Sequence, residues 1–176
     1  TSLVYSGLLK IGSDGDVIND LAKSYEISEN GLSYSFTLKD NLSFQDGTEL
    51  TTDDVEFTIK KIQDQNIKSP KESLWIGVKI EKIDAKTITF TLNKPYAPFI
   101  YNATIGIIPK HLWNNVSDDA FPFSQLNTIP IGSGPYTISK VTTDNSGLPT
   151  EYVLTANKQY VHGEPYITSI TIKAYL

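Results

Sequence analysis

The sequence contains no cysteine and no methionine. The lack of cysteine excludes a disulfide-bonded scaffold, thiol catalysis and zinc–thiolate sites. Methionine is absent even at position 1, so we expect the 176-residue chain to be a processed or cut product, or one that lost its initiator methionine. Either origin leaves open that the chain is part of a longer protein.

Long apolar runs and a concentrated basic face are also missing. Every purely apolar run is too short to span a bilayer, and the chain does not begin with the pattern of a signal peptide. A formal charge of −5 at pH 7 argues against nucleic acid as a partner, because phosphate binding needs clustered basic residues. The length suits one domain of ordinary size, or one domain with a smaller appendage.

Catalytic motifs are absent as well. The two histidines, His111 and His162, are far apart, and neither belongs to a zinc-binding His-Glu-x-x-His motif. The Gly-Ser-Gly-Pro sequence at residues 132–135 lacks both the spacing of a nucleophile elbow and the lysine of a phosphate loop. We therefore expect His111 on a helix surface, His162 in a turn, and no catalytic residues.

A calcium loop is the nearest approach to a metal site. Asp14, Asp16 and Asp20 are spaced in part like its ligands, but Ile18 stands where an oxygen ligand is needed. A solvated turn is the simpler interpretation. The sequence predicts no metal site and no cofactor, and hence a protein that is not an enzyme.

What the chain does contain is a clear order of local structural signals in residues 31–62. Apolar and polar residues alternate from Leu32 to Leu38, which predicts a strand, and Leu42 and Phe44 resume the alternation after a turn. Thr51 or Thr52 then provides a helix cap, and Asp53 and Asp54 suit the first turn of that helix. Val55, Ile59 and Ile62 follow at helical spacing.

The remainder of the chain is rich in predicted strands. We expect a short buried strand in residues 1–10, one helical turn at Leu21 and Ala22, a hairpin in residues 78–92, and strands near residues 136–138, 152–156 and 170–174. Short helices are expected after Pro109 and around residues 118–123. The fold class is therefore α+β, with mixed or antiparallel sheets and a few short helices.

Two segments combine small residues with aromatic ones. Tyr5, Ser6 and Gly7 form one, and Gly132, Ser133 and Gly134, followed closely by Tyr136, form the other. Small residues let a ligand approach backbone N–H and C=O groups closely, which favours a binding site. The alternative, that these glycines only serve turns, stays open.

Seven segments resemble, in order, signature motifs of the family 5 extracytoplasmic solute-binding proteins, which include the peptide, dipeptide and nickel receptors of ABC importers. The string LAKSYEISENGLSYSFTL is similar to the family's LAESWEVSEDGLTYTFKLR, and IGSGPY to its VGTGPY. One departure is Gln45, which we expect in a surface turn, where the family usually has His or Ser. The seven segments are residues 3–9, 21–38, 44–55, 89–99, 108–113, 131–136 and 157–165.

The resemblance implies a type II periplasmic-binding-protein fold, of which this chain holds most of the first lobe while the second lobe is missing. Residues 1–18 and 129–176 resemble the ligand-facing part of that lobe, and residues 19–128 resemble a subdomain inserted in it. By the same resemblance, both small-residue segments lie at the edge of the cleft. Tyr5, Ser6, Gly7, Gly132, Ser133 and Gly134 are accordingly the predicted ligand-binding residues.

The function implied is that of a substrate-binding component of an ABC importer, most simply for oligopeptides or dipeptides. Its partners would be a peptide or another small solute and the importer's membrane permease, with no nucleic acid, and it would act as a monomer. The expected location is extracytoplasmic, in the periplasm or lipid-anchored as a lipoprotein. A structural or adhesion domain, or a carbohydrate-binding domain at the cell surface, is the alternative.

Overall fold

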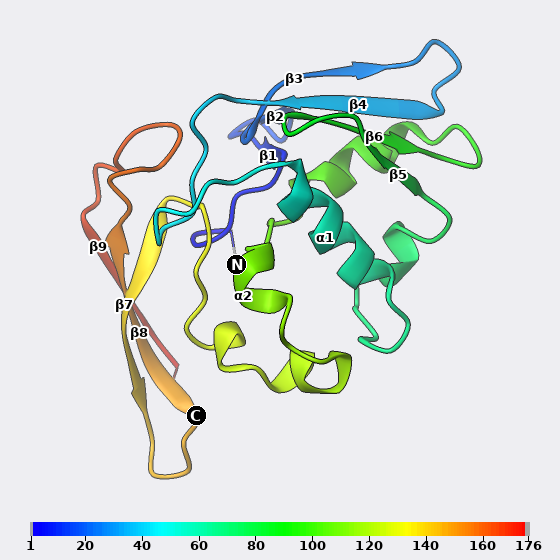
Figure 1. The fold of residues 1–176 in the computed structure, drawn as a ribbon. Helices are drawn as coiled ribbons and strands as arrows, with labels where there is room; N and C mark the ends of the chain where they lie inside the picture. The colour runs from blue at the N-terminus through cyan, green and yellow to red at the C-terminus, as the bar shows by residue number, and fades with distance from the viewer. Residues whose placement is uncertain (1, 175–176) are drawn as a thin grey trace.

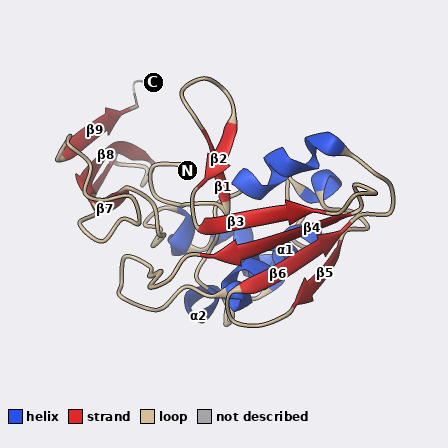
Figure 2. Ribbon diagram, turned by 90° about the horizontal axis from the view of Figure 1, so that it is seen from above, coloured by secondary structure: helices blue, strands red, loops and turns tan. Residues whose placement is uncertain are grey.

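The computed structural model describes residues 2–174, which form three antiparallel sheets with short helices (Figures 1 and 2). The largest sheet has the strand order β3-β4-β6-β5, where β3 is Ala22–Ile27, β4 is Ser33–Leu38, β5 is Lys79–Lys82 and β6 is Thr87–Thr91. Within the described residues, no helix is long and apolar enough to cross a membrane.

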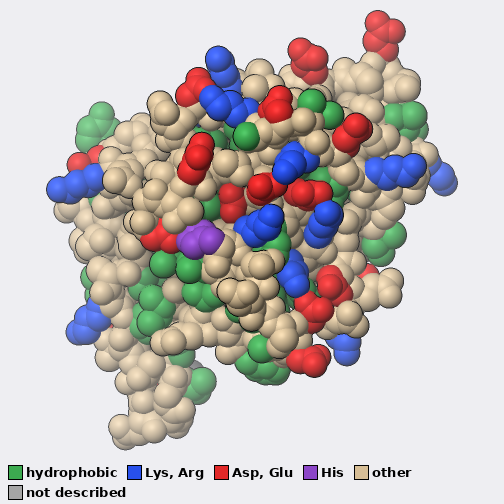
Figure 3. Space-filling view, in the orientation of Figure 1, with side chains coloured by type: hydrophobic (Ala, Val, Ile, Leu, Met, Phe, Trp, Pro, Cys, Tyr) green, Lys and Arg blue, Asp and Glu red, His purple; other side chains and the backbone are tan. Residues whose placement is uncertain are grey.

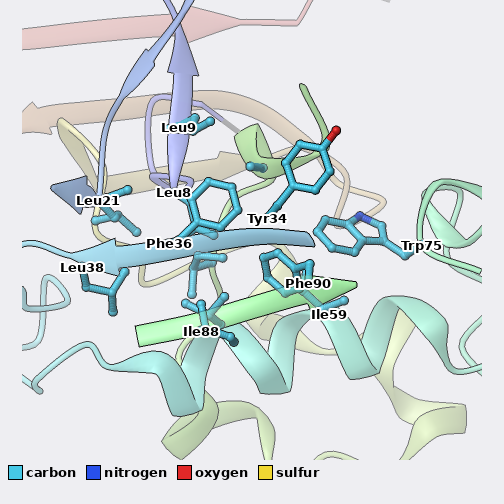
Figure 4. Close-up of a cluster of buried hydrophobic side chains, with 14 of the residues drawn as sticks. Leu8, Leu9, Leu21, Tyr34, Phe36, Leu38, Ile59, Trp75, Ile88 and Phe90 are labelled. Atoms are coloured by element: carbon cyan, nitrogen blue, oxygen red, sulfur yellow. The ribbon is translucent and has the colours of Figure 1, made fainter. Parts of the chain in front are cut away.

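The alternation in β4 and β6 sorts their side chains between two environments. Tyr34, Phe36 and Leu38 of β4 are buried, as are Ile88 and Phe90 of β6, whereas the serines and threonines between them stay partly exposed. Figure 4 shows the buried side chains in one cluster, to which α1 contributes Ile59. The predicted strand in residues 32–38 and the hairpin in residues 78–92 are both confirmed.

Helix α1, Thr52–Gln63, covers the inner face of this sheet and begins as the sequence predicts. Thr51 is the N-cap: its hydroxyl accepts a hydrogen bond from the Asp53 N–H at 3.2 Å, and its own N–H donates to Asp54 Oδ2 at 3.0 Å. This reciprocal arrangement is a capping box. Asp54 also accepts the Lys110 N–H, which ties α1 to helix α2, Lys110–Trp113.

Two smaller sheets lie beside the four-stranded sheet. In the first, β1, Leu9–Ile11, pairs with β2, Val17–Asn19. The second has the order β7-β8-β9, formed by Tyr136–Thr143, Pro149–Ala156 and Ser169–Lys173. Figure 2 shows the β1–β2 hairpin between the three-stranded and the four-stranded sheet.

Four short 3₁₀ helices complete the described elements. The longest, η2, spans Ala97–Thr104 and buries Phe99 and Ala103. η3 spans Asp118–Phe123, where the sequence predicts a short helix, and η1 and η4 are Glu72–Leu74 and Gln125–Asn127.

The buried apolar side chains form two clusters. The larger is shared by the four-stranded sheet, α1, η2 and residues Leu8 and Leu9, and it includes the fully buried Trp75. The smaller is centred on Val4, Tyr136 and Leu154, beneath the three-stranded sheet. Residues 4–9 of the chain therefore run from one core to the other.

Three local predictions are wrong. Leu21 and Ala22 do not form a helical turn, because Ala22 pairs with Leu38 and begins β3. Residues 42–44 are not a strand: Leu42 and Phe44 are buried, but they belong to a tight loop in which the only bridge joins Ser43 to Glu49. In the first case strand pairing overrides the local apolar spacing, and in the second the chain closes a tight loop in which the Phe44 N–H donates to Thr48 O.

The third concerns the start of the chain. Of the strand expected in residues 1–10, only Leu9 and Lys10 belong to a strand, β1; residues 2–4 form a turn, and residue 1 lies outside the described part. Val4 and Leu8 are buried in different cores, so the segment between them follows an irregular path. The predicted α+β class is confirmed, and every sheet pairing within residues 2–174 is antiparallel.

Candidate ligand-binding groove

A groove with a volume of about 820 Å³ lies beside the irregular segment that joins the two cores. Its lining comes from parts of the chain that are far apart in sequence, including β1, η2, α2 and the turn that precedes Gly163. Tyr5 and Gly7 line it, and so do Asp20, Pro135 and Tyr160. Apolar and aromatic side chains with a few polar groups are typical of small-molecule sites.

Tyr5 provides a neutral hydroxyl at this groove. Burial raises the pKa of Tyr5 to about 12, so the phenol keeps its proton at physiological pH and can donate a hydrogen bond. Its ring fits against glycines: a Cβ placed on Gly106 would lie 2.5 Å from Tyr5 Cβ. Glycine at that position is required for the tyrosine to sit where it does.

The second predicted segment packs against the first. Gly134 N–H donates to Val4 O at 2.8 Å, and a Cβ placed on Gly132 would lie 2.0 Å from the same oxygen. No larger residue fits between these two backbones. The two sequence-predicted segments are thus side by side, although more than 120 residues separate them in the chain.

Gln45 lies in a turn, as expected, but it is half-buried there and joins the two segments by hydrogen bonds. Its backbone N–H donates to Gly132 O at 2.8 Å, and its side-chain Oε1 accepts the Gly132 N–H at 3.2 Å. Its Nε2 donates to Tyr136 O at 2.8 Å. Gln45 is half-buried, and its amide supplies both the donor and the acceptor that pair with this backbone. No local sequence signal indicates this role.

The six predicted residues therefore occupy two different positions. Tyr5 and Gly7 line the groove, whereas Ser6, Gly132, Ser133 and Gly134 are buried and do not line it. The glycine at 132 serves close backbone packing, and the buried Ser133 Oγ has no hydrogen-bond partner among residues 2–174.

The backbone at Tyr5, Ser6 and Gly7 is paired through two of its C=O groups but not through its N–H groups. The C=O groups of Ser6 and Gly7 accept the N–H groups of Ile107 and Leu21, but within residues 2–174 none of the three N–H groups of this segment has a hydrogen-bond acceptor. Buried backbone donors are nearly always paired. Of the three, Tyr5 and Gly7 line the groove, so their N–H groups are the candidates for contact with a bound molecule.

A cluster of polar side chains lies at one part of the groove. Asp20 is 4% exposed, and its Oδ1 accepts hydrogen bonds from Tyr160 Oη at 3.3 Å and from His162 Nε2 at 2.9 Å. Burial lowers the pKa of His162, with the charges of Lys10 and Lys39 adding to the effect, so the ring is neutral at physiological pH. Burial also raises the pKa of Tyr160 to about 12.

The sequence places His162 in a turn but does not single out this cluster. His162 and Tyr160 belong to the connection between β8 and β9, and Asp20 to the connection between β2 and β3. Only the fold brings them together. Across the described residues, no group of three His, Asp or Glu side chains is close enough to hold a metal ion.

The other histidine, in α2, lies at the surface. His111 Nε2 is 2.7 Å from Asp46 Oδ2, next to the loop that ends at Leu50. Figure 3 shows this region with acidic and basic side chains interspersed over α1 rather than gathered by sign. His111 thus takes the surface position that the sequence predicts, and it does not line the groove.

Comparison with known proteins gives a consistent result. The model of the bacterial extracellular solute-binding proteins, family 5, matches residues 16–176. The probable D,D-dipeptide-binding periplasmic protein DdpA of Escherichia coli (strain K12) is 33% identical over 178 residues, which is 96% of this chain and 33% of DdpA.

Solved structures of similar proteins cover the same part. The oligopeptide-binding protein AppA from Bacillus subtilis in complex with a nonapeptide is 30% identical, with a TM-score of 0.89 over 99% of this chain and 34% of AppA. NikZ from Campylobacter jejuni in complex with Ni(L-His) is 30% identical, with a TM-score of 0.88 over 99% of this chain and 34% of NikZ. The predicted type II fold is confirmed, and the chain spans about a third of the relatives it matches.

Proposed function

The chain belongs to the bacterial extracellular solute-binding proteins of family 5, and on that basis we propose that it forms one wall of the ligand-binding cleft in the receptor of an ABC importer. The family consists of binding proteins, and for this chain too we propose binding without catalysis. Peptides are the proposed solutes, oligopeptides or dipeptides in particular. DdpA and AppA, which are similar to this chain, are a dipeptide-binding and an oligopeptide-binding protein by name.

The observation that carries the proposal is the unpaired backbone N–H groups of Tyr5 and Gly7, the two residues of this segment that line the groove. A peptide presents a C=O group at every residue, and alternate N–H groups of a protein segment can donate to such groups. Tyr5 Oη adds a side-chain donor at the same place. Backbone donors recognise the main chain of any peptide and leave its side chains to other parts of the groove.

We propose the following division of the chain. Residues 1–18 and 129–176 form the ligand-facing part, and residues 19–128 form a subdomain inserted between them. Supporting this, Val4 packs with Tyr136 and Leu154 in the smaller core, while the four-stranded sheet and α1 share the larger one. Leu8 and Leu9 join the larger core, so the two parts are firmly connected.

Members of family 5 act outside the cytoplasm, and we propose the same location for this protein, either in the periplasm or attached to the membrane by a lipid anchor. Its partners would be the solute and a membrane permease, and it would work as a monomer. Nucleic acid is not a proposed partner, because the net charge is −5 and basic side chains are dispersed on the face that Figure 3 shows.

The test uses the full-length protein that contains this chain. Mass spectrometry of the solute that co-purifies should identify peptides, and calorimetric titration of the stripped protein should then reproduce their binding. The 176-residue chain alone should bind the same peptides weakly or not at all, because it supplies a single wall. Absence of peptide binding by the full-length protein, or tight binding by this chain alone, would contradict the proposal.

A further inference from the structure

The polar cluster at the groove contains a buried acidic residue, Asp20, which packing alone does not require. Among the described residues that line the groove, Asp20 is the only acidic one, while Lys10 and Lys71 are basic. Asp20 is also one of only two buried acidic residues in the described chain, the other being the capping residue Asp54. A buried carboxylate is costly unless its charge is compensated.

The known partners of Asp20 occupy one of its two oxygens. The hydrogen bonds from Tyr160 and His162 both end on Oδ1, and among residues 2–174 no donor is within hydrogen-bonding distance of Oδ2. Although Oδ2 has no partner there, it is not fully enclosed by protein, and Asp20 lines the groove. Oδ2 is therefore the oxygen that a bound solute can reach.

The protein does not place a cation in contact with this carboxylate. His162 is neutral, for the reason given above, so it orients Asp20 without cancelling its charge. Lys10 Nζ lies over the Tyr160 ring, 5.8 Å from its centroid, and within the described residues no lysine nitrogen is within 4.0 Å of Asp20. Lys10 and Lys39 are close enough only to moderate the local potential.

We propose that Asp20 determines specificity in this groove: its Oδ2 accepts a hydrogen bond from an ammonium or guanidinium group of the bound solute. His162 and Tyr160 are positioning residues that hold Oδ1. Charge-assisted hydrogen bonds are stronger than neutral ones, and shielding from water strengthens them further. The inference rests on the proposed function, since it names the chemistry of the solute that the same groove would bind.

The cationic group has two possible sources in a peptide, which three probes separate. Trialanine carries only the α-ammonium, N-acetyl-alanyl-lysyl-alanine carries only a side-chain ammonium, and N-acetyl-trialanine carries neither. Each is titrated by calorimetry into the full-length protein and its Asp20→Asn variant. Asparagine keeps the size and the Oδ1 acceptor but removes the charge.

In the Asp20→Asn variant, at least one cation-bearing probe should bind about tenfold to a hundredfold more weakly, as expected for loss of a charged hydrogen bond. N-acetyl-trialanine should change less than about twofold, within the range of indirect effects. The affected probe identifies the source of the cation. Asp16→Asn, in an exposed turn nearby, is the matched control and should change none of the three affinities.

Two results would overturn the inference: unchanged affinities for both cation-bearing probes, or equal weakening of all three, which would indicate that Asp20 only ties two turns together. If the wild-type protein binds none of the peptides, the proposed function is wrong, but the inference about Asp20 can still be tested separately by thermal unfolding. n-Butylammonium or n-butylguanidinium should then raise the Tm of the wild-type protein, whereas n-butanol should not. No rise with either cation would overturn the inference, and this measurement does not depend on a folded variant.

Discussion

The four-stranded sheet with α1 and the wall of the groove are built on opposite plans. In the sheet, apolar side chains at regular spacing meet in one dense core: Phe90 contacts Trp75, Phe99 and Phe36 with ring centroids 5.1–6.3 Å apart. At the groove wall, glycines let backbones touch, and the N–H groups of Tyr5 and Gly7 have no acceptor within residues 2–174. The first plan gives stability, and under the proposed function the second leaves hydrogen-bonding groups for a solute.

The comparison predicts the largest loss of stability in the sheet. Phe90→Ala removes a fully buried ring and should lower the free energy of unfolding by about 3–5 kcal/mol. Chemical denaturation of the full-length protein measures this. Ile83→Ala, at a side chain that is 57% exposed, is the control and should cost no more than about 0.5 kcal/mol. A similar cost for both would mean that the sheet has no well-packed core.

At the groove wall, the sensitive position is a glycine. Gly132→Ala puts a methyl group against Val4 O, which is backbone and cannot move aside easily, so the free energy of unfolding should fall by about 3 kcal/mol. The matched control is Gly12→Ala, whose nearest neighbour is the end of the flexible Asp14 side chain at 3.0 Å. Equal effects at both glycines would show that residues 131–136 do not pack on residues 3–5 as described.

A smaller loss of stability is expected at the N-cap of α1. Thr51→Ala removes the hydroxyl that accepts the Asp53 N–H and should cost about 1 kcal/mol, without changing solute affinity. Thr51→Ser keeps the hydroxyl and should stay close to wild type. Loss of solute binding in Thr51→Ala at unchanged stability would break the separation between scaffold and groove.

The smallest effect concerns pH. The folded-state pKa of His162 is lowered by burial, so the unfolded chain takes up this proton first as the pH falls below about 6.5. The contribution of His162 to stability is thus present above that pH and is lost below it. Between pH 7.5 and pH 5.5 the wild type should therefore lose more stability than His162→Gln, measured by denaturation at each pH. Equal losses would show that His162 is not buried against Asp20.

The sequence predicts the four-stranded sheet and α1 better than it predicts the wall of the groove. Periodicity and capping identify β4, β6 and α1, because each depends on residues close in sequence. The prediction at Ala22 is wrong because a strand partner, Leu38, decides its conformation. The prediction at Phe44 is wrong because its N–H donates to Thr48 O and closes a tight local loop.

At the groove, small residues marked Tyr5–Gly7 and Gly132–Gly134, but which of them line it depends on how the two backbones pack. The contact of Asp20 with His162 joins residues 142 positions apart, and the roles of Asp20, Gln45 and Tyr160 appear only in three dimensions. Local sequence carries no signal for them.

The central claim, that the backbone at Tyr5–Gly7 receives the solute, is tested most directly by amide hydrogen exchange. The full-length protein is measured with and without a peptide that it binds. The N–H groups of Tyr5 and Gly7 should exchange more slowly when the peptide is present, while those of β4, already paired in the sheet, should not change. Unchanged exchange at Tyr5 and Gly7 in the peptide-bound protein would contradict the account.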